Sequence, residues 1–179
     1  MKQIFKLGLF IATLNFLTDC NGQTKTESNQ NEIKTDKNKL IGGGCDGCEL
    51  MYVGMPKVIS SEHTSNGWDE GKQKLILTGK VFQLDGRTPA SDVVIYYWHT
   101  DDSGLYSSND QTPKQAKEHG KLRGWVKSDK SGNYTIKTSR PDAYPNDNIP
   151  QHIHLSIKEP DIINEYYADL YFDDDPLYL

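Results

Sequence analysis

The fold is decided by residues 75–99, which read LILTGKVFQLDGRTPASDVVIYYWH. Two apolar runs, at residues 75–82 and 93–99, are rich in the branched and aromatic side chains that favour β-strands. Between them, Asp85 and Gly86 form a turn signal. We therefore predict two strands joined by a turn, and the unbroken apolar character of the second predicts that it is largely buried.

Further short strands are predicted along the rest of the chain. They are residues 124–128, 134–138, 152–158 and 168–172. The first two are expected to pair as a hairpin about the turn DKSG at residues 129–132, and residues 111–121 have room for one short helix. Short strands separated by Gly and Asp turns predict an all-β fold, an antiparallel β-sandwich, for a domain at residues 41–179 whose beginning, residues 41–74, is irregular.

The first twenty residues have the pattern of an export signal. Two lysines accompany an apolar run at residues 7–17 that is too short to span a bilayer but suits a signal peptide. The run ends in LTDC at residues 17–20, which resembles a bacterial lipobox, although an aspartate before the cysteine is unusual. We predict a signal peptide at residues 1–20 and lipidation at Cys20; the alternative is cleavage by ordinary signal peptidase somewhere after Thr18.

Composition limits the partners of the chain. Residues 21–40 are polar and almost free of apolar side chains, which predicts a flexible linker. The net charge is −5, and no lysine- or arginine-rich run is interleaved with aromatics, so no nucleic-acid partner is expected. The membrane would be reached only through the N-terminal lipid. Together these features predict an exported cell-envelope lipoprotein, periplasmic or attached to the outer membrane.

The three cysteines fit this reading. If Cys20 carries lipid, Cys45 and Cys48 remain as a pair. In an oxidising compartment, a CxxC in a glycine-rich loop is more often a short disulfide than a redox centre, so a Cys45–Cys48 disulfide is predicted. A structural Zn(II) site in which both cysteines join His152 and His154 is a competing hypothesis.

The triplet His152-Ile153-His154 carries the clearest chemical signal. On a strand, residues i and i+2 face the same side, so both imidazoles point one way while Ile153 faces the core. Two imidazoles on a rigid strand suit neighbouring positions around one metal ion. Taken alone, the triplet is a weak signal, because two polar residues on a solvated strand face give the same pattern.

Two tyrosines can complete such a site. Tyr144 lies shortly upstream of the histidines in a proline-rich loop, and Tyr106 follows the turn after the second strand. A phenol ionises near pH ~10 in water, so a strong Lewis acid must stabilise the phenolate. Fe(III) does this, whereas Zn(II) sites favour Cys, His and carboxylate. Most of the 10 tyrosines are nevertheless expected in the core or at the sandwich edges.

Other readings of the histidines and serines are weaker. His63, His99 and His119 are not expected to bind the metal, and His99 is expected to be a satisfied core residue or a donor behind a ligand. A cupin site needs a further histidine after His154, and none follows. A hydrolytic triad lacks a nucleophile elbow around any serine.

From about residue 75 to residue 176 the sequence resembles the catalytic domain of intradiol ring-cleavage dioxygenases, the group of protocatechuate 3,4-dioxygenase and catechol 1,2-dioxygenase. Matching pieces occur in the same order over somewhat more than half of the chain. The most specific are Gly104-Leu105-Tyr106, Tyr144-Pro145 and His152-Ile153-His154.

The resemblance implies one non-haem Fe(III) per chain, held by Tyr106, Tyr144, His152, His154 and a solvent-derived hydroxide. It implies that a small aromatic diol of the catechol type binds through both oxygens and displaces the hydroxide and one tyrosinate. O2 then opens the ring between the two hydroxylated carbons. Tyr106 and Tyr144 are therefore the expected catalytic residues, and sequence order does not say which of them leaves.

Two positions depart from the pattern of the family. Its well-known enzymes carry an arginine where Ile149 stands and a glutamine where Asp169 stands, both near the substrate. Arg123 or Arg140 are candidates to replace the missing arginine. Cys45 and Cys48, together with export, resemble a smaller secreted branch of the family. The departures at Ile149 and Asp169 have a different implication. They support an alternative function, a non-catalytic exported binding module that keeps a transthyretin-like sandwich.

Overall fold

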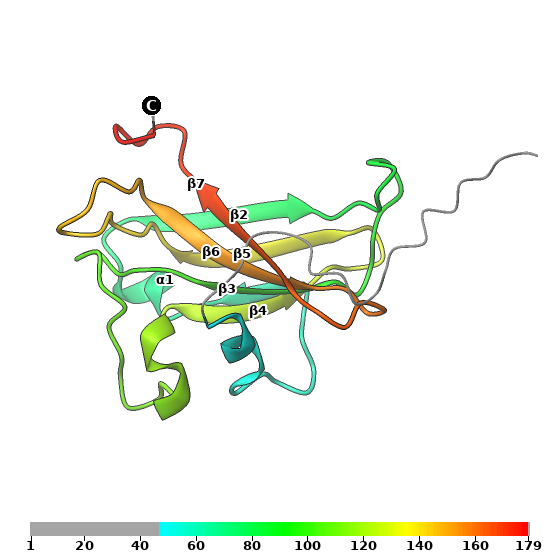
Figure 1. Cartoon of the computed structure of the whole chain (residues 1–179), viewed down its shortest axis with the longest axis horizontal. Coiled ribbons are helices and arrows are strands. Elements are labelled where there is room, and N and C mark those ends of the chain that lie inside the picture. Colours follow the sequence, from blue (N-terminus) through cyan, green and yellow to red (C-terminus); the bar gives the residue numbers. More distant parts are fainter. Residues whose placement is uncertain (1–46, 179) are drawn as a thin grey trace, which may run out of the picture. The chain divides into compact units, whose positions relative to one another are not determined.

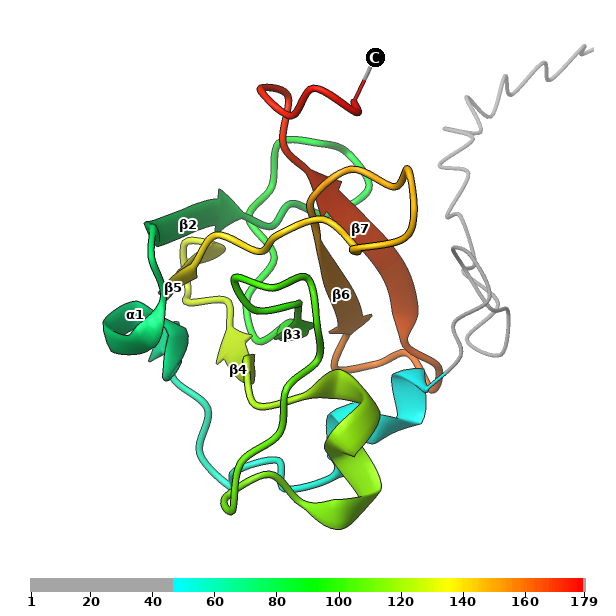
Figure 2. The same ribbon diagram turned by 90° about the vertical axis from the view of Figure 1, so that its left-hand side faces the viewer.

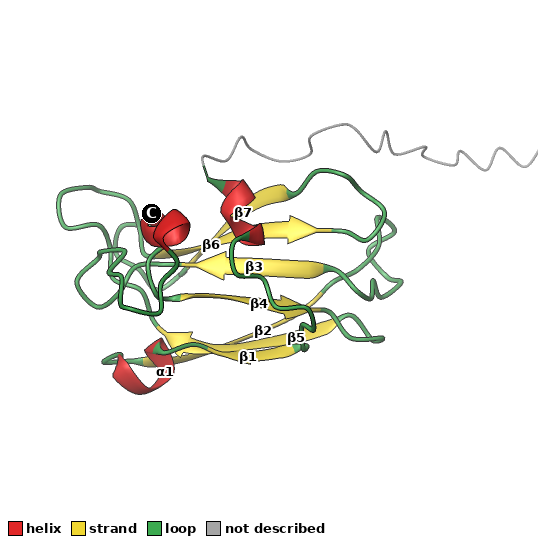
Figure 3. Cartoon of the chain, turned by 90° about the horizontal axis from the view of Figure 1, so that it is seen from below, coloured by secondary structure: helices red, strands yellow, loops and turns green. Residues whose placement is uncertain are grey.

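The computed structural model describes residues 47–178, which form two β-sheets. The predicted signal peptide, Cys20, the linker at residues 21–40 and Cys45 lie outside the described residues. The three-stranded sheet has the order β1 (Glu62–Thr64), β5 (Asn133–Ser139), β2 (Lys74–Lys80). The four-stranded sheet has the order β4 (Arg123–Lys127), β3 (Val94–Trp98), β6 (His152–Lys158), β7 (Tyr166–Tyr171) (Figure 1, Figure 3). The predicted all-β sandwich is confirmed.

Three short helices accompany the sheets. They are η1 (Cys48–Tyr52), α1 (Gly67–Glu70) and η2 (Lys114–His119). The helix expected in residues 111–121 is confirmed as a 3-10 helix, and Figure 2 shows it beside η1. The segment expected to be irregular contains η1, β1 and α1, and β1 pairs with β5 in parallel. Within the described residues, no helix is long and apolar enough to cross a membrane.

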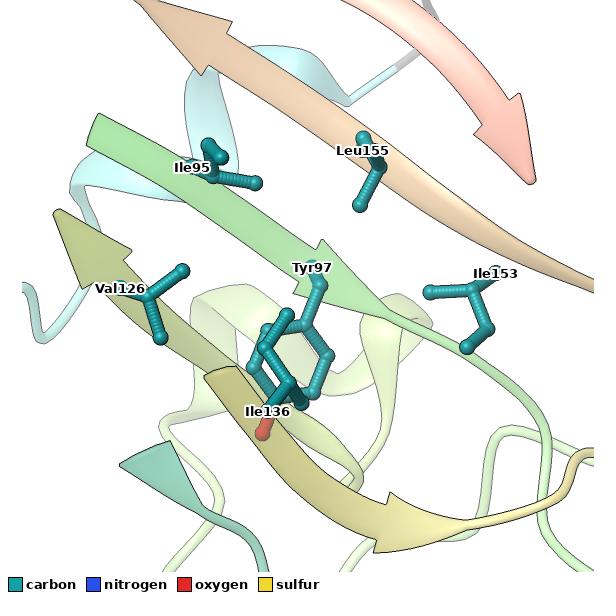
Figure 4. Packing of buried hydrophobic residues seen from close by; sticks show 6 residues of the cluster. All are labelled: Ile95, Tyr97, Val126, Ile136, Ile153 and Leu155. Atoms are coloured by element: carbon teal, nitrogen blue, oxygen red, sulfur yellow. The ribbon is translucent and has the colours of Figure 1, made fainter. Parts of the chain in front are cut away.

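The core lies between the two sheets, as the alternation of side chains dictates. Ile95 and Tyr97 of β3 and Ile153 and Leu155 of β6 point inward and are almost fully buried. Figure 4 shows them turned toward Ile136 of β5. The predicted inward placement of Ile153 is thus confirmed.

The predicted hairpin of residues 124–128 and 134–138 is wrong. A tight turn does join the two segments, since Gly132 N–H donates to the Asp129 carbonyl at 2.9 Å. However, β4 pairs with β3 and β5 pairs with β2, so the turn connects the two sheets. The reason is that both strands bury an apolar residue, Val126 and Ile136, and these face each other across the core instead of lying on one sheet.

The four-stranded sheet also buries its other face. Tyr96 and Trp98 of β3 point away from the sandwich core and pack against Met51 of η1. All three side chains are at most 4% exposed. This explains why the run at residues 93–99 is apolar without alternation: β3 has protein on both sides.

Strand pairing fixes a row of residues on this second face. Trp98 of β3 is aligned with His154 of β6, and His154 is aligned with Asp169 of β7. Two residue pairs further along, His152 is aligned with Tyr171. Side chains that are directly opposite each other in neighbouring strands point to the same face, so this register brings polar groups of three strands together.

His99 is one of the buried polar residues of the core. Its Nδ1 lies 2.7 Å from the Thr100 carbonyl oxygen, and its Nε2 lies 2.8 Å from Oγ1 of Thr138. His99 is therefore a satisfied core residue, one of the two roles that the sequence predicted. Burial lowers the pKa of the His99 imidazole to about 4.

Replacing Ile136 with alanine should destabilise the domain by about 2 to 5 kcal/mol, because Ile136 is fully buried between the sheets and its loss leaves a cavity. Ile76→Ala on β2 is the matched control, since Ile76 is 55% exposed. Urea unfolding measures both. Equal losses in the two variants would contradict the sandwich packing.

Stability should fall as the pH drops from about 6.5 to about 4. In that window the unfolded chain protonates His99 while the folded protein, whose His99 pKa is about 4, does not. His99 lowers the free energy of unfolding by about 1 kcal/mol per pH unit in this window. It has no such effect at a pH above its own pKa in the unfolded chain. Urea midpoints across this range should show a shallower slope in His99→Gln than in the wild type; identical slopes would rule out His99 as a source.

Candidate metal centre

Two histidines and two tyrosines meet at one end of the four-stranded sheet. His152 and His154 begin β6 on the same face, and their Nε2 atoms are 3.2 Å apart. Tyr106 comes from the loop after β3, and Tyr144 comes from the loop before β6. Because β3 ends where the antiparallel β6 begins, both loops reach the same end of the sheet.

Each of the four polar atoms contacts at least two of the others. The Tyr106 hydroxyl lies 2.5 Å from the Tyr144 hydroxyl and 2.7 Å from Nε2 of His154. The Tyr144 hydroxyl lies 3.2 Å from Nε2 of both His152 and His154. The structure therefore brings together all four side chains that the sequence singled out, and their role as metal ligands stays a prediction.

The hydrogen-bond partner of His152 determines which of its two nitrogens carries the proton and which offers a lone pair to the cluster. Nδ1 of His152 lies 2.7 Å from the Pro150 carbonyl oxygen, which can only accept a hydrogen bond. Nδ1 therefore carries the proton. Burial also lowers the pKa of His152, so at neutral pH its Nε2 offers a lone pair to the cluster.

His154 is held in the same orientation by a carboxylate. Its Nδ1 lies 2.7 Å from Oδ1 of Asp169, and the Tyr167 hydroxyl donates to the same oxygen at 2.6 Å. The Tyr167 hydroxyl also lies 2.7 Å from Nδ1 of His154. An ionised carboxylate can only accept a hydrogen bond, so Nδ1 of His154 is assigned as the protonated nitrogen. The unprotonated Nε2 is directed at the two phenols.

Aromatic side chains brace His154 from the neighbouring strand. The Trp98 indole stacks on the His154 ring with centroids 5.0 Å apart and on the His119 ring with centroids 4.0 Å apart. His119 is anchored in turn, because its Nδ1 lies 2.8 Å from the Tyr96 hydroxyl. His119 thus packs on Trp98, which itself stacks on His154. His63 lies elsewhere, where its Nδ1 is 2.7 Å from the Tyr97 hydroxyl.

Hydrogen bonds to backbone carbonyl groups join the loop that carries Tyr106 to the loop that carries Tyr144. Thr100 Oγ1 donates to the Asp142 carbonyl at 2.6 Å, and the Asp142 N–H donates to the Asp101 carbonyl at 3.2 Å. Gly104 has a φ of 71°, and a Cβ at this position would lie 2.0 Å from the Ala143 carbonyl oxygen. Glycine is required there for both its conformation and its size. This explains the glycine in the Gly-x-Tyr motif.

A second glycine supports Tyr106 from the other side. Gly120 has a φ of 67°, and a Cβ there would lie 2.9 Å from the carbonyl carbon of Tyr106. The backbone at the end of η2 therefore packs directly on the backbone of Tyr106. The phenol is positioned by the main chain on both flanks of its loop.

The donor set suits a hard, highly charged metal ion. Burial and the neighbouring Tyr144 hydroxyl raise the pKa of Tyr106, and burial raises the pKa of Tyr144. Both phenols therefore remain protonated at neutral pH unless a strong cation stabilises the phenolates. Two phenol oxygens together with two imidazole nitrogens fit Fe(III) in this respect.

The competing zinc site does not fit. Cys48 is disulfide-bonded, which removes its thiolate from metal binding. Cys45 lies outside the described residues, so the Cys45–Cys48 pairing itself stays a prediction. Among residues 47–178, no group of three His, Cys, Asp or Glu side chains is arranged to hold a metal. The cluster described above is not such a group, since two of its four side chains are tyrosines.

The two candidate arginines are engaged elsewhere. Arg140 binds Asp174 through both terminal nitrogens, at 2.6 and 2.8 Å, and donates to Gln151 through Nε at 2.7 Å. The Arg123 guanidinium lies over the Trp125 ring at 4.9 Å and donates to the Val53 carbonyl. Both guanidinium groups are therefore held by partners outside the cluster of two tyrosines and two histidines.

Sequence reasoning missed Tyr167 altogether. The predicted strand began at residue 168, whereas β7 begins at Tyr166. A strand extended by two residues would have placed Tyr167 and Asp169, two positions apart, on one face with the histidines. The role of Asp169 as a partner of His154 was equally invisible, because it depends on the pairing of β6 with β7.

Comparison with known proteins adds an independent finding. A protein-family model described as "Dioxygenase" matches residues 55–179. Catechol 1,2-dioxygenase of Acinetobacter baylyi is 30% identical over 95 residues, which are 53% of this chain and 30% of that protein. Chlorocatechol 1,2-dioxygenase of Pseudomonas sp. (strain P51) is 29% identical over 121 residues, 56% of this chain and 46% of that protein. The chain thus spans less than half the length of the curated relatives it matches.

Solved structures show the same fold. The dioxygenase domain of a dioxygenase–carbohydrate-binding fusion from Streptomyces sp. SirexAA-E superposes with a TM-score of 0.50 at 25% identity, covering 68% of this chain and 71% of that one. Catechol 1,2-dioxygenase from Pseudomonas arvilla C-1 gives a TM-score of 0.55 at 23% identity, covering 77% of this chain and 46% of that one.

Gly104→Ala should destabilise the protein well beyond the cost of placing alanine at a positive φ, which is about 1 to 2 kcal/mol. The added methyl group would meet the Ala143 carbonyl and push the two tyrosine loops apart. Gly86→Ala is the matched control, because Gly86 has a φ of 67° and no atom within 4 Å of its Cβ position. Urea unfolding compares the two variants. A Gly104→Ala loss no larger than that of Gly86→Ala would contradict the contact.

Proposed function

The chain belongs to the intradiol dioxygenase family, and from this membership we propose that it is a non-haem Fe(III) enzyme that uses O2 to cleave a catechol-type ring between its two hydroxylated carbons. The observation that carries the proposal is the convergence of the Tyr106, Tyr144, His152 and His154 donor atoms, each of which lies 2.5 to 3.2 Å from at least two of the others. Two phenols and two imidazoles are hard to explain as a purely structural cluster.

In this proposal Tyr106, Tyr144, His152 and His154 hold one Fe(III). When bound, Fe(III) supplies a Lewis acid that draws electron density from a catecholate and makes its ring reactive toward O2. The two imidazoles are fixed by the strand and by their Nδ1 partners. The two phenols are carried by loops, so the tyrosine side of the cluster is the side that yields to a substrate.

The phenols also have a role in proton transfer. Their hydroxyl oxygens lose protons when the cation is present, and burial makes each phenolate a strong base. A phenolate released from the cluster can therefore take the proton of a substrate hydroxyl at its own oxygen.

The location of the enzyme belongs to the same proposal. The basic and apolar start of the chain and the LTDC sequence support export and anchoring of the chain through lipid on Cys20 in the cell envelope. The polar residues 21–40 would then link the lipid to the catalytic domain. Substrate and O2 would meet the enzyme outside the cytoplasm.

The wild-type protein loaded with Fe(III) should be coloured by a tyrosinate-to-iron absorption band, and anaerobic addition of catechol should shift that band. Admission of O2 should then yield a ring-opened diacid, detected by mass spectrometry. Tyr106→Phe and His152→Ala should lose both the original band and turnover, because each removes one donor of the cluster. Tyr134→Phe, on the other sheet, is the matched control and should behave as the wild type.

A colourless protein that cannot take up Fe(III) would overturn the proposal and favour the non-catalytic binding module. Full turnover in Tyr106→Phe or His152→Ala would contradict the assignment of the ligands.

A further inference from the structure

We propose that Asp169 is a positioning residue of the metal centre. It fixes the orientation of His154 and makes Nε2 of His154 a stronger electron-pair donor to the metal. The inference rests on the proposed function, since it concerns how one of the proposed ligands is held. It gives a role to a position at which the chain departs from the glutamine of the well-known enzymes.

The register of the sheet delivers the carboxylate to the imidazole. Asp169 of β7 is aligned with His154 of β6, and Oδ1 of Asp169 lies 2.7 Å from Nδ1 of His154. The two side chains are 19% and 13% exposed, so water competes little for this contact. A hydrogen bond between a carboxylate and an imidazole in such surroundings is stronger than one between neutral groups.

Tyr167 holds the carboxylate in place. Its hydroxyl donates to Oδ1 of Asp169 at 2.6 Å, the same oxygen that faces His154. Tyr167 and Asp169 are two residues apart on β7, so the strand itself presents both to one side. The Tyr171 hydroxyl lies 3.4 Å from the other carboxylate oxygen, Oδ2. These contacts restrict the orientation of the Asp169 carboxylate.

The two histidines consequently have different partners. The Nδ1 proton of His152 is donated to a neutral carbonyl, that of Pro150, whereas that of His154 is donated to the anionic carboxylate of Asp169. An anionic acceptor polarises the imidazole more strongly and raises the electron density at the opposite nitrogen. Nε2 of His154 is therefore a stronger electron-pair donor than Nε2 of His152.

Tyr167 limits this effect. A hydrogen bond from the Tyr167 hydroxyl withdraws electron density from Oδ1, the oxygen that receives the His154 proton. The same hydroxyl lies 2.7 Å from Nδ1 of His154, where its neutral oxygen competes with the carboxylate for that proton, so both contacts weaken the interaction of His154 with the anion. Removing the carboxylate charge and removing the Tyr167 hydroxyl should therefore change the donor strength of His154 in opposite directions. A role limited to filling space would not produce opposite signs.

The test uses Asp169→Asn and Tyr167→Phe in the Fe(III)-loaded protein, with two readouts that do not depend on turnover. The first is the position of the tyrosinate-to-iron absorption band, and the second is Fe(III) affinity in competition with a chelator. Asp169→Asn keeps an oxygen acceptor but loses the charge, so the band should move to longer wavelength and the affinity should fall about 10- to 100-fold. Tyr167→Phe should move the band to shorter wavelength.

Asp92→Asn is the matched control. Asp92 is an exposed carboxylate that is paired with Lys127, and asparagine tolerates its φ of 61°. This variant should keep the band and the affinity of the wild type. Circular dichroism establishes that each variant is folded, and if Asp169→Asn does not fold, the sign of the Tyr167→Phe shift decides the matter.

The outcomes separate the two proposals. A coloured wild type with an unchanged band and affinity in Asp169→Asn, or with shifts of the same sign in both variants, overturns the role of Asp169 and leaves the proposed function standing. A wild type that takes up no Fe(III) overturns both.

Discussion

The antiparallel register of β3, β6 and β7 is the constraint on which the site depends. It aligns Trp98, His154 and Asp169 in one row across three strands, so that the stacking partner and the hydrogen-bonding partner of His154 arrive from its two sides. Side chains alternate along a strand, so a slip of one residue would turn the imidazoles into the core and Ile153 outward. The burial of Ile153 and Leu155 opposes such a slip and thereby protects the site.

The same sheet serves two purposes because it buries both of its faces. One face, with Ile95 and Tyr97, closes the sandwich, and the other, with Tyr96 and Trp98, carries η1, η2 and the candidate metal centre. A solvated outer face would have left the donors in water. Packing of Met51, Tyr96 and Trp98 against Tyr106 instead removes part of the cluster from water, and burial raises the pKa of both phenols.

The strands and the local arrangement of the histidines followed from the sequence, whereas the non-local features did not. That His152 and His154 share a face needs only the two-residue period of a strand. Tyr106 and Tyr144 are 38 positions apart, and only the resemblance to a family linked them. The hairpin of residues 124–128 and 134–138 failed for the same reason: turn residues predict a reversal of the chain but not the sheet that each strand joins. The partnership of Tyr167 and Asp169 with His154 likewise depends on strand pairing that no local pattern encodes.

The division of the donors between a strand and two loops has a consequence for metal selection. The two imidazoles lie two residues apart, so they come together as soon as β6 forms, whereas the phenols need contacts across 38 and 48 positions and therefore the closure of long loops. A half-folded chain would offer only a pair of imidazoles, which many divalent metals accept. The hard oxygen donors arrive with the finished tertiary structure. If the cluster binds Fe(III) as proposed, discrimination between metals would be a property of the completed fold.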